Sequence, residues 1–265
     1  MPDAVFFRDG DRFVPTELAR GPWTPQAQHG GAPAGLLARA VERFEGGETM
    51  FVARLTIELL RPVPISPLSI DARFARPGRK VQLVVASLSS GDTEVARVTA
   101  LRIRRVEMPL PADLPRAAPP PGPHSGTASL PPWAAAVGYP AFHSRAVEHR
   151  FVSGSFERPG PATDWIRLRV PLVDGEPTSP LCRVAAASDF GNGVSWVLDR
   201  ADGYSFINPD LTVYLHRLPA GEWVCLEAVT RVEAEGVGLA ESTLYDEHGP
   251  IGRAVQSLIV EHAPH

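Results

Sequence analysis

The chain contains the same run of predicted elements twice, and this internal repeat constrains its fold more than any other sequence feature. Three anchors recur at one offset of 156 residues: Leu55–Arg61 with Leu211–Arg217, Val95–Arg97 with Ile251–Arg253, and Gly35 with Gly191. Three matches at one spacing favour a duplicated unit over coincidence. Two fused copies are expected to pack as a pseudo-twofold dimer within one chain.

In the first copy, a helix is predicted over Ala32–Phe44, with Pro33 in its first turn and Leu37 and Val41 on one face. Four strand-like runs with turn residues between them follow this helix: Leu55–Leu59, Ile70–Phe74, Val81–Val85 and Val95–Ile103. One helix followed by closely spaced antiparallel strands predicts an α+β unit in which a sheet curls over the helix.

In the second copy, Ser188-Asp189 is expected to cap a helix that runs through Val194 to Leu198. Four strand-like runs follow again: Leu211–Leu215, Trp223–Val229, Leu239–Tyr245 and Ile251–Val260. Upstream, Arg12–Val14 aligns with Arg150–Val152 at an offset of 138, which predicts about 18 extra residues before the second helix.

The segment between the copies is rich in proline, with ten prolines between Glu107 and Pro140. Proline supplies no backbone donor to a strand or helix, so this stretch is predicted to be a linker without packed elements. The predicted organisation is a first unit over 1–106, a linker over 107–140 and a second unit over 141–265.

Composition excludes several classes of function. The formal charge of −4 and the pI near 6.1 show no excess of basic residues that would bind nucleic acid or an anionic membrane. The sequence has no run of about 18 apolar residues, so no membrane insertion is predicted. The two cysteines, Cys182 and Cys225, lack metal-site spacing and are expected to be reduced thiols in a cytoplasmic protein. Signatures for nucleotide phosphates, zinc proteases and serine hydrolases are absent, so we expect no metal and no cofactor.

Polar residues distinguish the second copy from the first at three aligned positions. Asp189 aligns with Pro33, Asn208 with Val52, and Gln256 with Ala100. Such a difference is expected if the second copy has kept a functional site and the first copy has lost its own. Each residue also has a structural interpretation, since Asp189 could cap a helix, Asn208 could form a turn with Pro209, and Gln256 could be a core amide bonded to backbone.

A glycine pair precedes the first helix and suggests a different role for the first copy. In His29-Gly30-Gly31, the glycines would let a ligand approach backbone N–H groups at the positive end of the helix, where a carbonyl oxygen could bind. His29 could act as a general base or lie in a plain loop, and the sequence leaves both open.

These segments resemble the acyl-CoA thioesterase II family of double-hotdog enzymes. The resemblance rests on the order and spacing of His29–Gly35 and Leu59–Pro62 in the first copy and of Pro171–Gly175, Ala186–Gly193 and Ala254–Gln256 in the second. It implies an α+β double hotdog, two tandem units that each wrap an antiparallel sheet around a central helix. It also implies hydrolysis of acyl-CoA to fatty acid and CoA by direct water attack, in a homo-oligomer of double hotdogs.

The family's catalytic aspartate and glutamine fall on Asp189 and Gln256, and its hydroxyl residue falls on Asn208, which is a departure. The thioester oxygen is expected near Gly31, with His29 and Gly30 beside it. Two alternatives remain: a non-catalytic module that binds acyl thioesters or acyl carriers, and an enoyl-CoA hydratase or dehydratase. The hydratase interpretation requires a histidine shortly after the aspartate, and none follows Asp189.

Overall fold

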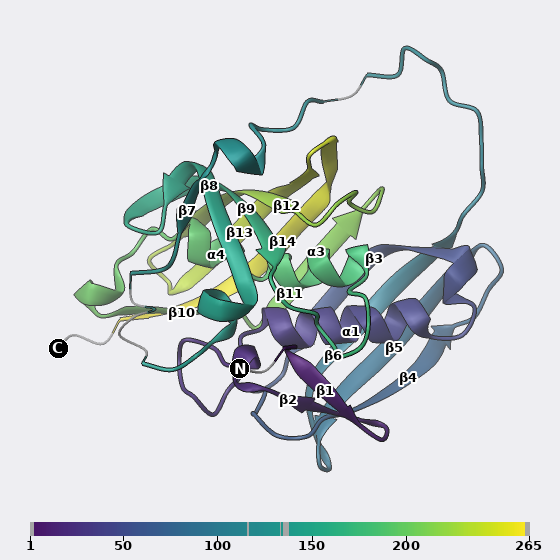
Figure 1. The fold of residues 1–265 in the computed structure, drawn as a ribbon, viewed down its shortest axis with the longest axis horizontal. Helices are drawn as coiled ribbons and strands as arrows, with labels where there is room; N and C mark the ends of the chain where they lie inside the picture. Colours follow the sequence, from purple (N-terminus) through teal and green to yellow (C-terminus); the bar gives the residue numbers. More distant parts are fainter. Residues whose placement is uncertain (1–2, 116, 133, 135–137, 263–265) are drawn as a thin grey trace.

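Two α+β units are joined edge to edge through one long antiparallel sheet (Figure 1). The computed structural model describes residues 3–115, 117–132, 134 and 138–262. The strand order of the large sheet is β4-β5-β6-β3-β11-β14-β13-β12-β9-β8-β7, with β10 also paired to β14. One helix lies against each half, as the repeat predicts.

The first unit begins with a short hairpin and continues through one helix into four strands. Its elements are β1 (Phe6–Asp9), β2 (Arg12–Pro15), the 3-10 turn η1 (Glu17–Ala19), α1 (Gly31–Arg43), η2 (Gly47–Thr49), β3 (Met50–Leu59), β4 (Ser69–Arg76), β5 (Val81–Ser90) and β6 (Thr93–Arg104).

The second unit has the same core plan, with more short helical segments. Its elements, counted from the end of the first unit, are η3 (Pro123–Ser125), β7 (Thr127–Ser129), the π-helical turn η4 (Phe142–Ala146), β8 (Val147–Ser155), β9 (Arg158–Leu168), α3 (Pro180–Ser188), α4 (Gly191–Val194), η5 (Arg200–Asp202), β10 (Tyr204–Ile207), β11 (Asp210–Leu215), β12 (Val224–Val232), β13 (Val237–Asp246) and β14 (Gly249–His262).

The offset of 156 residues holds in the strands. β5 and β13 differ by this number at both ends, and β4 and β12 match to within one residue. The two units meet where β3 pairs with β11, and there Thr56 lies directly opposite Thr212, its own counterpart. A residue that faces its counterpart marks the local twofold axis, so this pair locates the pseudo-twofold of the chain.

The predicted second helix is wrong in position. α3 begins after Ser179, whose hydroxyl accepts from the Cys182 N–H, and it ends at Ser188. Asp189 is therefore the C-cap of α3 and not an N-cap, and only the short α4 follows it. The strand offset does not extend to the helices because loops, and not ladder hydrogen bonds, connect them to the sheet.

The proposed match of Arg12–Val14 with Arg150–Val152 is also wrong. Phe13 exchanges backbone hydrogen bonds with Leu68, just before β4. At the offset of 156, Leu68 corresponds to Val224 at the start of β12, and Val224 lies opposite Ile166. Phe13 thus corresponds to Ile166 on β9. The resemblance of three residues is too short to fix an alignment.

The proline-rich segment contains more structure than predicted. Within it, β7 pairs with β8 through Thr127 and Phe151, and the Pro121 carbonyl accepts from the Trp165 indole N–H at 2.7 Å. The prediction that this stretch contains no packed element is wrong at these points. The domain limits of 1–106 and 141–265 stay a prediction.

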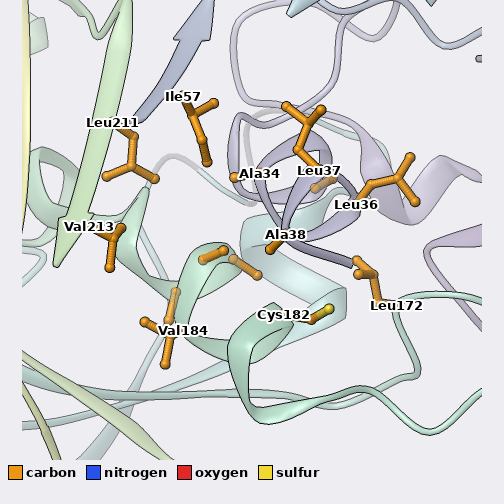
Figure 2. Close-up of a cluster of buried hydrophobic side chains, with 14 of the residues drawn as sticks. Ala34, Leu36, Leu37, Ala38, Ile57, Leu172, Cys182, Val184, Leu211 and Val213 are labelled. Carbon is orange, nitrogen blue, oxygen red and sulfur yellow. The ribbon is translucent and has the colours of Figure 1, made fainter. Parts of the chain in front are cut away.

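The two helices share one core. Figure 2 shows Ala38 of α1 on the side that faces α3, the helix that carries Val184, with strand residues from β3 and β11 in the same cluster. Small residues allow the close approach, since a Cβ on Gly35 would lie 3.5 Å from the Ala186 Cβ and 3.2 Å from Leu172. This packing brings the start of α1 next to the end of α3. Both cysteines are buried and free.

Candidate active site

Asp189 lies where the C-terminus of α3 meets the N-terminus of α1. A carboxylate at the C-terminus of its own helix is disfavoured by the helix dipole, whereas one at the N-terminus of a neighbouring helix is favoured. The packing is close enough that a Cβ on Gly30 would lie 2.7 Å from Asp189 Oδ1. The positive helix end that stabilises this carboxylate therefore belongs to the other repeat.

Three side chains donate to the Asp189 carboxylate. Asn208 Nδ2 lies 2.8 Å from Oδ1, and Gln256 Nε2 lies 3.4 Å from the same oxygen. His29 Nδ1 lies 2.9 Å from Oδ2. The structure thus brings Asp189, Asn208 and Gln256 together, and it adds His29 from the first unit.

Gln256 is fully buried behind the carboxylate, and both ends of its amide are engaged. Nε2 also donates to the Asp189 backbone oxygen at 3.1 Å, and Oε1 accepts from the Asn192 N–H at 3.2 Å. The amide spans the break between α3 and α4, where helical hydrogen bonding is interrupted. Gln256 thereby fixes the backbone that carries Asp189.

The electrostatics keep Asp189 ionised. Burial opposes the charge, but the hydrogen bond from His29, with further hydrogen bonds from Asn208 and the Gly31 N–H, holds the pKa of the carboxyl below its ordinary value. Only 5% of the side chain is exposed. The site therefore contains a desolvated carboxylate at neutral pH.

A cavity of about 660 Å³ opens next to this cluster, within the size range of small-molecule sites. Asp189, Asn208, His29 and Gly30 all line it. Five aromatic side chains make much of its apolar wall: Trp23, Phe156, Phe190, Trp196 and Phe206. Such a wall suits an apolar ligand, with the polar cluster at one side.

The two glycines before α1 have different positions. The Gly31 N lies 3.1 Å from His29 Nδ1, and its N–H also helps to lower the pKa of the Asp189 carboxyl. Gly31 does not line the cavity. Gly30 does line it, and we find no hydrogen bond from its N–H to any described residue. A Cβ on either glycine would collide, with Asp189 at Gly30 and with the Ala186 carbonyl at Gly31.

Sequence reasoning missed the side chains that hold His29. Its ring packs against Phe142, at 5.2 Å, and Phe190, at 4.4 Å between ring centroids, and those two rings also stack on each other. His143 also lines the cavity, 6.3 Å from His29 by the same measure. Phe190 follows Asp189 directly and could have been suspected, whereas no local pattern singles out Phe142 or His143. In the described part of the chain, no cluster of three metal-ligating side chains occurs.

Comparison with protein families matches residues 111–260 to the acyl-CoA thioesterase C-terminal domain and residues 19–103 to the acyl-CoA thioesterase N-terminal domain. The chain belongs to the acyl-CoA thioesterase family. The family resemblance predicted from the sequence, the α+β double hotdog fold and the assignment as an enzyme are therefore confirmed.

Solved structures show the same fold at low sequence identity. A proposed thioesterase II from Thermobifida fusca YX is 19% identical with a TM-score of 0.73, over 97% of this chain and 95% of that one. A hot dog protein of unknown function from Alicyclobacillus acidocaldarius is 17% identical (TM-score 0.71, 99% and 98% covered). Acyl-CoA thioesterase II TesB2 from Mycobacterium marinum is also 17% identical (TM-score 0.64, 89% and 90% covered).

No curated protein matches the chain by sequence. Across the described residues, no helix is long and apolar enough to cross a membrane.

Proposed function

We propose that this acyl-CoA thioesterase hydrolyses acyl-CoA to a carboxylic acid and CoA by direct attack of water at the Asp189 cluster. The supporting observation is that Asn208 and Gln256, which come from separate elements, both donate to the Asp189 carboxylate, and that this carboxylate lies at the wall of the cavity. Held in place, a water and a thioester carbonyl react as an intramolecular pair, which accounts for much of the rate gain in such sites.

Asn208 and Gln256 have different roles in this proposal. Asn208 lines the cavity and its Nδ2 donates to Asp189. Its Oδ1 accepts from none of the described residues, and it can accept a hydrogen bond from water. An amide can thus replace the hydroxyl group that the family resemblance implies here. Gln256 acts from behind, by fixing Asp189, and it does not reach the cavity.

The thioester oxygen has a binding position at the start of α1. The Gly30 N–H lies at the positive end of this 13-residue helix and on the cavity wall. A backbone donor at a helix N-terminus stabilises the oxyanion that forms when water adds to the carbonyl. The acyl group would lie against the aromatic wall. Assembly into a homo-oligomer and a cytoplasmic location stay predictions.

A thiol-release assay with acyl-CoAs of increasing chain length tests the function. The wild type is expected to release CoA, and Asp189→Asn, which keeps the volume of the side chain, is expected to lower kcat by about 100-fold or more. Tyr214→Ser on the exposed outer face of β11 is the matched control and should leave kcat unchanged. Failure of the wild type to release thiol from any acyl-CoA would refute the proposal.

The structure gives one observation in favour of a second activity. Although no histidine follows Asp189 in sequence, His29 from the other repeat lies 2.9 Å from its carboxylate, which forms an Asp/His pair of the kind that an enoyl-CoA hydratase uses. Loss of enoyl absorbance on addition of enoyl-CoA, without thiol release, would favour the hydratase. Binding of acyl-CoA without either reaction would favour the non-catalytic module.

A further inference from the structure

Three contacts fix the orientation of His29. Phe142 and Phe190 hold its ring, and Nδ1 points to Asp189 Oδ2 at 2.9 Å. The side chain is 11% exposed and forms part of the cavity wall. An imidazole held in this way keeps one nitrogen on the carboxylate and leaves the other, Nε2, for the cavity side.

The contact with Asp189 decides the tautomer. Nδ1 lies 2.9 Å from Asp189 Oδ2 and 3.1 Å from the Gly31 N, and it cannot both donate to the carboxylate and accept from the Gly31 N–H. The charged carboxylate is the stronger partner, and it also receives the Gly31 N–H, so we assign the proton to Nδ1, which donates it to Oδ2. In neutral imidazole the lone pair is then on Nε2. Nε2 forms no hydrogen bond with any described residue. It is also absent from the fully buried side-chain atoms without a partner, so Nε2 is accessible from outside the protein core.

Asp189 itself is poorly suited to accept a proton. Oδ1 already receives two amide N–H groups, and Oδ2 receives the imidazole N–H. These donors favour the charged form, and they hold the pKa of the carboxyl below its ordinary value. A carboxylate with a lowered pKa is a weak general base, because the driving force for proton transfer falls with the pKa.

We propose that His29 Nε2 is the general base of the hydrolysis and that Asp189 acts as its positioning residue across the boundary between the repeats. This inference rests on the proposed thioesterase function. It assigns a catalytic role to a residue of the first unit and separates that role from the orientation of water by Asn208.

The step balances without any further reactant. The oxygen of water bonds to the thioester carbon while one of its protons passes to Nε2, which gives a tetrahedral oxyanion and an imidazolium. The carbon–sulfur bond then breaks, the carbonyl re-forms as the carboxylic acid, and the imidazolium returns its proton to the sulfur of CoA. The Asp189 carboxylate stabilises the imidazolium between the two steps.

A second buried Asp/His pair provides a contrast. His149 Nδ1 lies 2.5 Å from Asp164 Oδ2, but both side chains are 0% exposed and neither lines the cavity. A base must reach its proton directly or through one water. Of the two pairs, only His29–Asp189 meets this condition.

His29→Asn separates the role of base from that of anchor. The asparagine amide can still donate to Asp189 in place of Nδ1, but it has no basic nitrogen in place of Nε2. For a general base, kcat is expected to fall by about 10²- to 10⁴-fold, with a smaller change in KM. Imidazole added to His29→Ala is expected to restore part of kcat. His216→Ala, at an exposed histidine, is the matched control and should equal wild type.

Two outcomes would overturn the assignment to His29. One is a kcat of His29→Asn within about threefold of wild type, which would reduce His29 to an anchor of Asp189. The other is no response of His29→Ala to imidazole at any concentration that leaves the wild type active. In both cases the wild type still hydrolyses acyl-CoA, so they are distinct from failure of the proposed function, in which the wild type is inactive.

Discussion

At the scale of single residues, the site depends on the absence of a side chain at its glycines. Gly30 leaves the space that the Asp189 carboxylate occupies, since a Cβ there would lie 2.7 Å from one oxygen and 2.8 Å from the other. The same glycine offers its N–H to the cavity. The sequence suggested Gly30 for its backbone freedom, and the structure shows that its small volume matters at least as much.

Gly30→Ala is expected to lower kcat by about 10-fold or more, because the added methyl group displaces Asp189 by a few tenths of an ångström and misplaces the reacting groups. Thiol release under saturating substrate measures this effect. Gly122→Ala is the control, because its Cβ would meet no atom within 4 Å. Equal activity of both variants would contradict the close packing described here.

His143 supplies a test of burial by pH. Desolvation, with smaller effects from His29, His149 and Arg200, lowers the pKa of His143 to about 3. The unfolded chain takes up this proton below pH about 6.5, whereas the folded chain stays neutral, so stability falls as the pH falls through this interval. Between pH 7 and pH 5 the wild type should lose about 2 kcal/mol more than His143→Gln in urea unfolding. Parallel losses in the two proteins would contradict the burial.

At the scale of elements, Arg102 ties α1 to the sheet beneath it. Its guanidinium is fully buried and donates to the carbonyls of Val41, Phe44 and Glu45 at the end of the helix, at 3.2, 2.6 and 2.8 Å. Carbonyls at a helix C-terminus have no partner within the helix and require one elsewhere. A buried arginine on a strand is thus the C-terminal cap of α1.

Arg102→Met should lower the free energy of unfolding by about 3 kcal/mol, since it removes the charged donor that these three carbonyls share. Urea denaturation measures the loss. Arg253→Ala, at an exposed position on β14, should change the free energy of unfolding by no more than about 0.5 kcal/mol. Similar stabilities of the two variants would exclude the capping role.

At the scale of the whole molecule, both repeats contribute to one hydrophobic core. The same cluster contains Leu37 of α1, Val184 of α3 and Leu226 of β12. β3 and β11 also join the two halves of the sheet through backbone hydrogen bonds. A shared core of this kind predicts that the two units unfold together in one cooperative transition.

Leu37→Ala in the first unit is expected to lower the free energy of unfolding by about 2–5 kcal/mol. The loss should appear equally in far-ultraviolet circular dichroism and in tryptophan fluorescence, both measured in a Trp23→Phe background, in which no tryptophan of the first unit remains and Trp165 and Trp223 report on the second. A fluorescence midpoint that stays at the wild-type value while circular dichroism shifts would show that the units unfold separately.

The sequence determined the duplicated plan and the positions of the strands, because alternation of apolar residues and a constant offset are local properties that ladder hydrogen bonds preserve. It also singled out Asp189, Asn208 and Gln256 by their polarity against apolar residues at the offset of 156, although for Asp189 this alignment falls in the helices, where the offset does not hold. The start of α3 lay outside this reasoning, since the offset of the strands says nothing about loop-connected helices. The Ser179-Pro180 cap was the available signal.

Only the tertiary structure decided how these residues are used. The dipole that stabilises Asp189, the glycine that makes room for it and the imidazole that faces it all belong to the other repeat. Their contact depends on the packing of α1 against α3, which brings together positions far apart in sequence. No pattern within either repeat encodes that contact, because it arises where the two copies meet.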